Sequence, residues 1–94
     1  MPLPDEFLQT VKDSNEITSV MSTYVSLKRA GRDSVCLCPF HSEKTPSCHI
    51  YTDTQSFYCF GCGASGNVIT FVMEYENYSF QEAVQLLAER SGIQ

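Results

Sequence analysis

The chain has 94 residues, 43% of them hydrophobic, and a formal net charge of −5. This length suits one small domain near the lower limit of what an apolar core stabilises alone, and the composition is that of a folded chain rather than a disordered one. No apolar run is long enough to cross a bilayer, and the acidic start MPLPDEF has no signal-peptide core, so we expect a cytoplasmic protein with no membrane partner.

The first 24 residues predict two short helices. Pro4 followed by Asp5 and Glu6 is typical of a helix start, because proline fits the first turn and acids favour its positive end. Asp13 and Glu16 have the spacing of a capping box, which predicts the start of a second helix. Apolar residues of this second helix recur at helical intervals, at Ile17, Val20, Met21 and Tyr24.

The middle of the chain predicts two β-hairpins. Residues 25–28 and 34–38 are strand-like runs separated by AGRD, and they form the first hairpin. Residues 47–51 and 56–59 are joined by the turn-rich segment TDTQ, and they form the second.

The last third of the chain predicts two more helices. Asn67 can cap the first, whose apolar positions are Val68, Phe71, Val72 and Tyr75. Ser79 and Glu82 form a capping box ahead of the second, and Gly92 ends it. The apolar stripe of this last helix consists of Phe80, Ala83, Val84, Leu87 and Ala88.

Four residues have the pair-spacer-pair pattern of a tetrahedral metal site, namely Cys38, His41, Cys59 and Cys62. Zinc takes four nitrogen or sulfur ligands, and two ligands three residues apart need a tight turn that aims both side chains inward. Pro39 helps to form the first turn, and Gly61 and Gly63 allow the strained backbone of the second. We expect one structural zinc per chain, and such ions contribute about 10–16 kcal/mol to the folding of comparable small modules.

Other interpretations of the cysteines are weaker. A disulfide framework is not expected, because the chain has no export signal and an odd number of cysteines, 5. Cys59-x-x-Cys62 alone resembles a redox pair, but no βαβ unit surrounds it. We expect Cys36 to be a strand residue, Cys48 a small core residue and His49 an exposed residue on the opposite strand face.

Two catalytic interpretations are also disfavoured. Four protein ligands leave zinc no open position for water, so the site is expected to be structural, with no catalytic residue in this chain. Gly61-x-Gly63-x-x-Gly66 lies between a strand and a helix, as a dinucleotide-binding loop does. The metal ligands would clamp that loop, however, and no second strand carrying an acidic residue follows.

The stretches CPFHSEKTPS and FYCFGCGASGNVITFVME resemble the N-terminal zinc-binding domain of bacterial replicative DNA primases. The resemblance extends to DSNEI, YVSLKRAGR and SFQEAVQLLAERSGI, and so it covers nearly the whole chain. The ligands of that family match Cys38, His41, Cys59 and Cys62. One departure is Cys48, where family members usually have phenylalanine.

The predicted fold class is α+β, a small zinc ribbon with an antiparallel β-sheet flanked by short N- and C-terminal helices. We expect a single zinc-binding domain over residues 1–94. Its parts are a helical N-terminus (1–24), the zinc ribbon (25–66) and the C-terminal helices (67–92).

The resemblance implies a parent enzyme, a nucleotidyltransferase that synthesises short RNA primers on single-stranded DNA for replication. In such primases the polymerase chemistry belongs to a separate central domain, and a C-terminal domain engages the replicative helicase; neither is expected within this chain. The zinc domain is expected to contact template and to act with the polymerase domain, in cis or from a neighbouring primase.

Single strands are held by a basic groove and by aromatic faces on which bases stack. The candidate template-binding residues are Lys28, Arg29, Arg32, Lys44, Tyr51 and Tyr58. We expect Phe57 and Phe60 to be core residues instead. Two alternatives stay open: the zinc module of a plasmid, phage or transposon primase-like protein, and a zinc-stapled protein-interaction domain without DNA contact, which the acidic ends of the chain permit.

Overall fold

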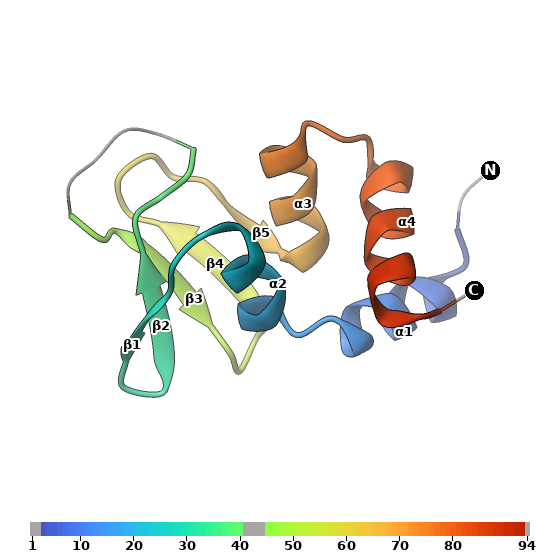
Figure 1. Cartoon of the computed structure of the whole chain (residues 1–94), viewed down its shortest axis with the longest axis horizontal. Helices are drawn as coiled ribbons and strands as arrows, with labels where there is room; N and C mark the ends of the chain where they lie inside the picture. The colour runs from blue at the N-terminus through green and yellow to red at the C-terminus, as the bar shows by residue number, and fades with distance from the viewer. Residues whose placement is uncertain (1–2, 41–44, 94) are drawn as a thin grey trace.

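The computed structural model describes residues 3–40 and 45–93. Four helices and five strands follow one another along this part of the chain, as α1 (Asp5–Ser14), α2 (Ile17–Tyr24), β1 (Lys28–Ala30), β2 (Asp33–Cys36), β3 (Cys48–Tyr51), β4 (Ser56–Cys59), β5 (Ser65–Asn67), α3 (Val68–Glu76) and α4 (Phe80–Ser91). The sheet forms one end of the molecule and α1 with α4 the other, with α2 and α3 between them (Figure 1). The predicted α+β class is therefore confirmed.

The five strands form a meander in the order β1-β2-β3-β4-β5, and every neighbouring pair is antiparallel. One face of the sheet is buried against the helices, and the other is open. Directly opposite residues share a face, so the register Cys36↔Cys48 and Cys48↔Cys59 places three cysteines in one row on the buried face. The register Val35↔His49 and His49↔Tyr58 forms a row on the open face.

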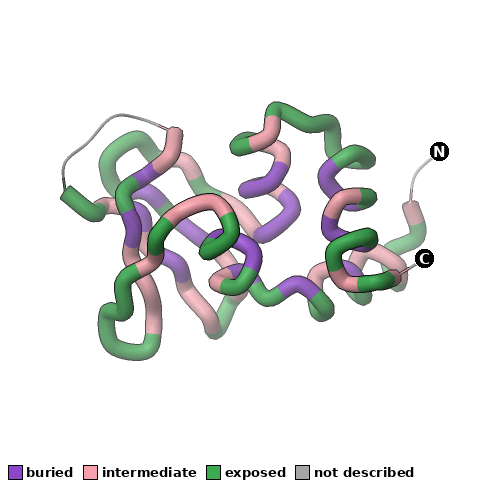
Figure 2. The backbone as a smooth tube through the Cα atoms, viewed as in Figure 1, coloured by how far each residue is buried: buried purple, intermediate pink, exposed green. Residues whose placement is uncertain are grey.

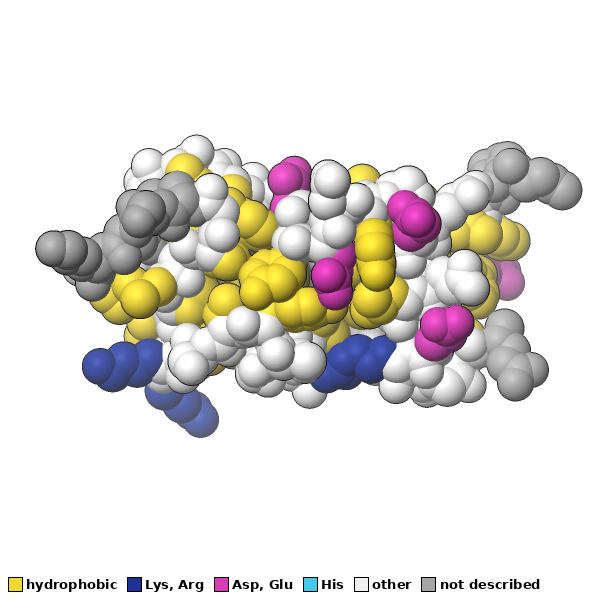
Figure 3. All heavy atoms as spheres, turned by 45° about the horizontal axis from the view of Figure 1, so that its top comes forward, with side chains coloured by type: hydrophobic (Ala, Val, Ile, Leu, Met, Phe, Trp, Pro, Cys, Tyr) yellow, Lys and Arg dark blue, Asp and Glu magenta, His cyan; other side chains and the backbone are white. Residues whose placement is uncertain are grey.

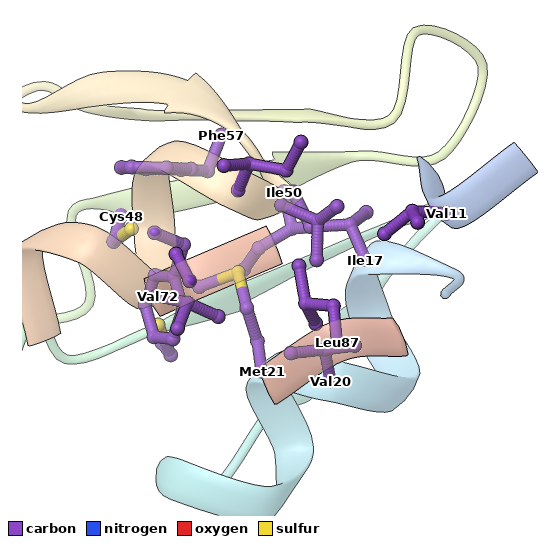
Figure 4. Packing of buried hydrophobic residues seen from close by; sticks show 14 of the residues in the cluster. Val11, Ile17, Val20, Met21, Cys48, Ile50, Phe57, Val72 and Leu87 are labelled. Atoms are coloured by element: carbon purple, nitrogen blue, oxygen red, sulfur yellow. The ribbon is translucent and has the colours of Figure 1, made fainter. Parts of the chain in front are cut away.

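The core joins the buried face of the sheet to the inner sides of the helices (Figure 4). Ile50 of β3 and Phe57 of β4 are 0% and 2% exposed, and Ile17 and Met21 of α2 are both 0% exposed. Figure 2 shows that buried positions recur along the inner sides of α3 and α4 and in the central strands. The predicted apolar positions of α2 are thus core residues at Ile17, Val20 and Met21.

Asn15 is a buried polar residue at the junction of α1 and α2, with 2% of its surface exposed. Its side-chain nitrogen donates to the carbonyl oxygens of Val11 at 2.8 Å and Leu87 at 3.1 Å, and to the Ser91 hydroxyl at 3.3 Å. The bonds to Leu87 and Ser91 connect the end of α1 to the last turns of α4, so they join the N-terminal and C-terminal helices.

The local signals for helix starts and stops were right in four places and wrong in one. Pro4 is the N-cap of α1, with Asp5 and Glu6 in the first turn. Asn67 accepts a hydrogen bond from the Thr70 amide, the predicted capping box before α4 is present, and Gly92 ends α4 in the left-handed conformation. The box predicted from Asp13 to Glu16 is wrong: Asp13 lies inside α1, where it accepts a hydrogen bond from Gln9, and α2 is capped by Glu16 itself.

The strands differ from expectation at their ends. The first hairpin was expected to start at residue 25, but its strands span only Lys28–Ala30 and Asp33–Cys36. The second hairpin matches the prediction to within one residue. Strand β5 was not predicted at all. Phe80 was expected on the apolar stripe of α4, but it lies at the first position of the helix and is 42% exposed.

No helix among residues 3–40 and 45–93 combines the length and the apolar character that a membrane-spanning segment needs.

Candidate metal centre

Three of the four predicted ligands come together at one end of the buried cysteine row. Cys38 lies two residues beyond β2, Cys59 ends β4, and Cys62 lies in the turn that follows. Their three sulfur atoms all lie within 4.8 Å of one another. The fourth predicted ligand, His41, lies outside the described residues.

The spacing of the sulfur atoms fits a tetrahedral zinc ion. Zinc–thiolate bonds are about 2.3 Å long, which places two sulfur ligands of one tetrahedral ion about 3.8 Å apart. The Sγ atoms of Cys38 and Cys62 are 3.7 Å apart. Thiolates are soft ligands that select zinc or similar ions over magnesium or calcium, so the donor set fits zinc as well as the distance does.

Hydrogen-bond donors from the surrounding turns point at the sulfur atoms. The Phe40 amide donates to Cys38 Sγ at 3.4 Å, and the Gly61 amide donates to Cys59 Sγ at 3.3 Å. The Ser47 hydroxyl lies 3.4 Å from Cys59 Sγ. Such contacts orient metal ligands and stabilise the thiolate form that a metal requires.

The turn that carries Cys62 depends on a glycine. Gly63 has φ of +82°, in the left-handed region that glycine adopts without strain. Its amide donates to the Cys59 carbonyl at 2.8 Å, and the Cys59 amide donates to the Ala64 carbonyl at 2.8 Å. The chain therefore reverses sharply within four residues, and this reversal brings Cys62 back toward Cys59.

The thiols of the cluster differ in acidity when no metal is bound. Burial raises the pKa of Cys38 to about 12, and its contacts with the neighbouring thiols act in the same direction. Burial also opposes ionisation of Cys59, but hydrogen bonds from Ser47 and from the backbone of Cys62 and Gly61 outweigh it and lower the pKa of Cys59 to about 7. Cys59 is therefore the first of the two to offer a thiolate to a cation, and a bound cation favours deprotonation of the others.

The remaining cysteines lie where they were expected. Cys36 on β2 and Cys48 on β3 are 3% and 0% exposed, and neither belongs to the three-cysteine cluster. His49 lies on the open face of the sheet, opposite to Cys48, as its place in the strand predicted, but it is half-buried there rather than exposed.

The predicted template-binding residues are divided between the hairpin and the open face. Lys28 pairs with Val35 and so lies on the open face, whereas the neighbouring Arg29 belongs to the opposite face of the β1 edge. Arg32 lies in the turn between β1 and β2, where it forms an exposed ion pair with Asp53 at 3.8 Å. Lys44 lies outside the described residues.

Four rings form a continuous patch on the open face, and we call this patch the aromatic face: His49, Tyr51, Tyr58 and Phe60. The ring of His49 lies parallel to that of Tyr51, with centroids 6.3 Å apart. Phe60 meets Tyr58 and His49 edge-on at 4.8 Å and 5.0 Å.

The exposure of Phe60 contradicts the prediction that it is a core residue. It is 64% exposed, whereas Phe57 is 2% exposed. The alternation along β4 could have revealed this, because Phe57 and Cys59 point inward while Tyr58 points outward, and the same alternation continued by one residue sends Phe60 outward.

Charge is unevenly distributed over the surface. In Figure 3 basic side chains project at the sheet end of the molecule and a further one lies near its middle, while acidic side chains lie over the middle and the helical half. The acids of the helical half include Asp5, Glu6, Glu82 and Glu89. The basic side chains of the first hairpin, Lys28, Arg29 and Arg32, therefore lie at one end of a molecule of net negative charge.

The sequence and the fold are similar to those of DNA primases. Residues 3–94 match the family model described as the CHC2 zinc finger. The chain is 52% identical over 91 residues to the DNA primase of Clostridium acetobutylicum and 47% identical over 91 residues to that of Thermotoga maritima; each match covers 97% of this chain. These matches cover only 15% and 16% of the relatives, so the chain spans a small fraction of their length.

A solved structure has the same fold. The structure of the zinc-binding and RNA polymerase domains of the Aquifex aeolicus primase superposes with a TM-score of 0.89 and 38% sequence identity. The match covers 94% of this chain and 22% of that one.

Proposed function

Because the chain belongs to the CHC2 zinc-finger family of DNA primases, we propose that it is a module that holds one structural zinc and binds single-stranded template DNA during primer synthesis. The observation that carries the zinc part is the cluster of three thiols within 4.8 Å. The observation that carries the template part is an exposed aromatic face beside a basic hairpin.

The proposed zinc ligands are Cys38, Cys59, Cys62 and His41. When bound, zinc supplies a cross-link between the end of β2 and the turn after β4. Four protein ligands leave no position for a reactive water, which favours a structural role over a catalytic one. Among residues 3–40 and 45–93, the thiol cluster is the one group of three or more His, Cys, Asp or Glu side chains that could hold a metal ion, so we assign polymerase chemistry to the rest of the parent protein.

Metal analysis of single cysteine variants tests the zinc site. The purified chain should contain one zinc, and replacing any of the three clustered cysteines with serine should abolish zinc binding and folding together. Cys36→Ser and Cys48→Ser are matched controls, since both remove a buried thiol outside the cluster. Loss of zinc from the Cys36→Ser variant would show that the ligand set is wrong.

The template part rests on the chemistry of single-strand recognition. Bases stack on exposed aromatic rings, each contributing roughly 1–3 kcal/mol, and basic side chains follow the phosphates. The aromatic face offers rings with open surfaces at Tyr58 and Phe60, which are 41% and 64% exposed. Lys28 lies in the same row as Tyr58, so one strand can contact both a ring and a cation across the sheet.

Salt dependence separates the two kinds of contact. If Lys28, Arg29, Arg32 and Lys44 all meet phosphates, log K against log salt should have a slope of roughly −3, because each contact on a single strand contributes about −0.7. Arg29→Ala should make the slope shallower by about 0.7, and Lys12→Ala on α1 should leave it unchanged.

Aromatic contacts should respond differently. Phe60→Ala should weaken binding of an oligothymidylate by roughly 1–3 kcal/mol while leaving the salt slope as it was, because a ring releases no counterion. The readout is a fluorescence-anisotropy titration at several salt concentrations. Absence of binding at low salt, or binding indifferent to all of these changes, would favour the alternative of a zinc-stapled protein-interaction domain.

In this proposal the partners of the chain are the template and the polymerase domain of the primase, in cis or from a neighbouring molecule. The replicative helicase contacts other regions of the parent, at the replication fork in the cytoplasm. The isolated chain should therefore synthesise no primer from nucleoside triphosphates on any template. Primer synthesis by a contaminant-free preparation would refute the modular assignment.

A further inference from the structure

The buried face of the sheet carries two cysteines that the metal cluster does not use, Cys36 and Cys48. Cys48 of β3 lies directly opposite Cys59 in the register of β3 and β4, and both are 0% exposed. We propose that Cys48 and Cys59 form an oxidative modification site, in which a peroxide oxidises the metal-binding thiols, Cys48 captures Cys59 in a cross-strand disulfide and the metal is released. This inference rests on the proposed zinc site, of which Cys59 is a ligand.

The hydrogen-bond pattern of the strands indicates that Cys48 lies closer to Cys59 than to Cys36. The Phe60 amide donates to the Ser47 carbonyl at 2.9 Å, so residues 47 and 60 form a hydrogen-bonded pair. Hydrogen-bonded and non-hydrogen-bonded pairs alternate along an antiparallel ladder, which makes Cys48 and Cys59 a non-hydrogen-bonded pair with Cα atoms about 4.5 Å apart. That separation lies within the range of about 4.4–6.8 Å that a disulfide spans.

Cys36 is the other neighbour of Cys48, on the opposite side of β3. The amide and carbonyl groups of successive residues in a central strand point to alternate sides. Cys48 and Cys36 therefore form a hydrogen-bonded pair, whose Cα atoms are about 5.5 Å apart and whose side chains are less close. The register thus favours Cys59 over Cys36 as the partner.

The oxidant reaches this buried pair through the exposed thiol of Cys62. The Cys62 sulfur attacks a peroxide oxygen, the O–O bond breaks, and a sulfenic acid forms with loss of water. The Cys59 sulfur then displaces the hydroxyl as a second water to form a Cys59–Cys62 disulfide. Finally the Cys48 sulfur attacks Cys59, and Cys62 leaves as a thiol.

Protons and electrons balance over these reaction steps. Cys48 and Cys59 together lose two protons and two electrons, and one hydrogen peroxide accepts them and becomes two waters. A cluster that has lost Cys59 to a disulfide lacks a ligand and releases the ion. Because Cys62 is regenerated, a reductant that cleaves the single cross-strand disulfide restores all the ligands.

Peptide mapping of the zinc-loaded chain after hydrogen peroxide treatment and thiol alkylation tests the proposal. Chymotrypsin cleaves after large aromatic residues, and Tyr51, Tyr58 and Phe60 place the three cysteines of interest in separate peptides. A Cys48–Cys59 disulfide therefore joins two chymotryptic peptides. Trypsin gives an independent check, because the sequence has no lysine or arginine between residues 45 and 89, so this disulfide stays within one tryptic peptide.

We expect the joined chymotryptic peptides to appear as zinc is released, and Cys48 to lose its reactivity toward the alkylating agent. Cys48→Ser and Cys48→Ala should stop the reaction at the Cys59–Cys62 disulfide, whereas Cys36→Ser should behave like the parent chain. The proposal is overturned if Cys48 remains alkylated in oxidised, zinc-free protein, or if it is found joined to Cys36.

Zinc content measured before oxidation separates this result from a failure of the proposed function. A chain that binds no zinc at the start contradicts the metal site. A chain that binds zinc and then loses it without a Cys48–Cys59 disulfide contradicts only the modification site.

Discussion

Replacing Asn15 with aspartate should destabilise the fold in a way that depends on pH. The Asn15 side-chain nitrogen faces three acceptors, two of which are the carbonyl oxygens of Val11 and Leu87. Aspartate has the same shape but presents oxygen in place of that nitrogen. At neutral pH a buried carboxylate would therefore face the two carbonyl oxygens, which cannot donate to it.

The magnitude follows from the bonds that are lost. Asn15→Ala removes the donors to the two carbonyls, each contributing about 1 kcal/mol, and leaves buried acceptors short of a partner, for a total loss of roughly 2–3 kcal/mol. Asn15→Asp adds an uncompensated buried charge, which raises the loss at neutral pH to roughly 3–5 kcal/mol. Small domains have only about 5–15 kcal/mol of stability, so either loss is easily measured.

The direction of the pH dependence distinguishes the two variants. Burial and the facing carbonyls raise the pKa of the new carboxyl in the folded state above its unfolded value. The Asn15→Asp variant is therefore most stable at acidic pH, where the carboxyl is protonated in both states, and it loses stability as pH rises through the folded-state pKa. Asn15→Ala has no group that titrates and should show no such change relative to the parent chain.

Urea unfolding followed by circular dichroism at about pH 5 and about pH 7 measures this difference. The parent chain at each pH serves as the reference, so that any effect of acid on the metal ligands cancels. If Asn15→Asp and Asn15→Ala lost equal stability at both pH values, the side-chain nitrogen could not be the group that connects α1 to α4.

Three further predictions concern other parts of the molecule. Tyr24 donates to Glu76 at 3.1 Å, and burial together with that carboxylate raises the pKa of Tyr24 to about 12. The stability of the fold should therefore fall as pH rises from about 10 to about 12. Tyr24→Phe should flatten that fall in an alkaline titration of the free energy of unfolding. Gly66→Ala should lower the urea midpoint by the equivalent of roughly 1–3 kcal/mol, because a Cβ there would lie 2.5 Å from the Thr70 side chain. Gly31→Ala is the control and should lower the midpoint less, because a Cβ at Gly31 would have no atom within 4 Å. A strong zinc chelator should lower the melting temperature of the chain, and added zinc should restore it in a calorimetric scan.

The features that could be predicted from sequence are those that depend on residues a few positions apart. The Ser79–Glu82 capping box and the Asn67 cap each involve a side chain and an amide three residues away, so their signals are complete in the local sequence. The same reasoning failed at Asp13, where the spacing of a capping box occurred inside a helix. There a bond from Gln9 one turn earlier keeps Asp13 helical, and Glu16 caps α2.

Features that depend on segments far apart in the sequence could not be predicted from local patterns. Residues 65–67 have no apolar alternation, and they form β5 only because β4 offers its free edge to them. The burial of Asn15 likewise depends on α4, which follows it by more than 70 residues in the sequence. The metal ligands were the exception among features that join distant segments. Their pairs, with two ligands three residues apart, can be recognised in the sequence before the fold is known.

The arrangement of the elements along the longest axis also determines how the domain can be carried by a larger protein. Leu3 and Ile93 line the same hollow between α1 and α4, so both ends of the described chain emerge at the helical pole. The cysteine cluster and the aromatic face belong to the sheet at the other pole, in a molecule 40 Å long. A flexible tether at either terminus would leave the sheet unobstructed and swing it through an arc with a radius of nearly that length. The length of the domain would therefore determine how far from the point of attachment the sheet can meet another molecule.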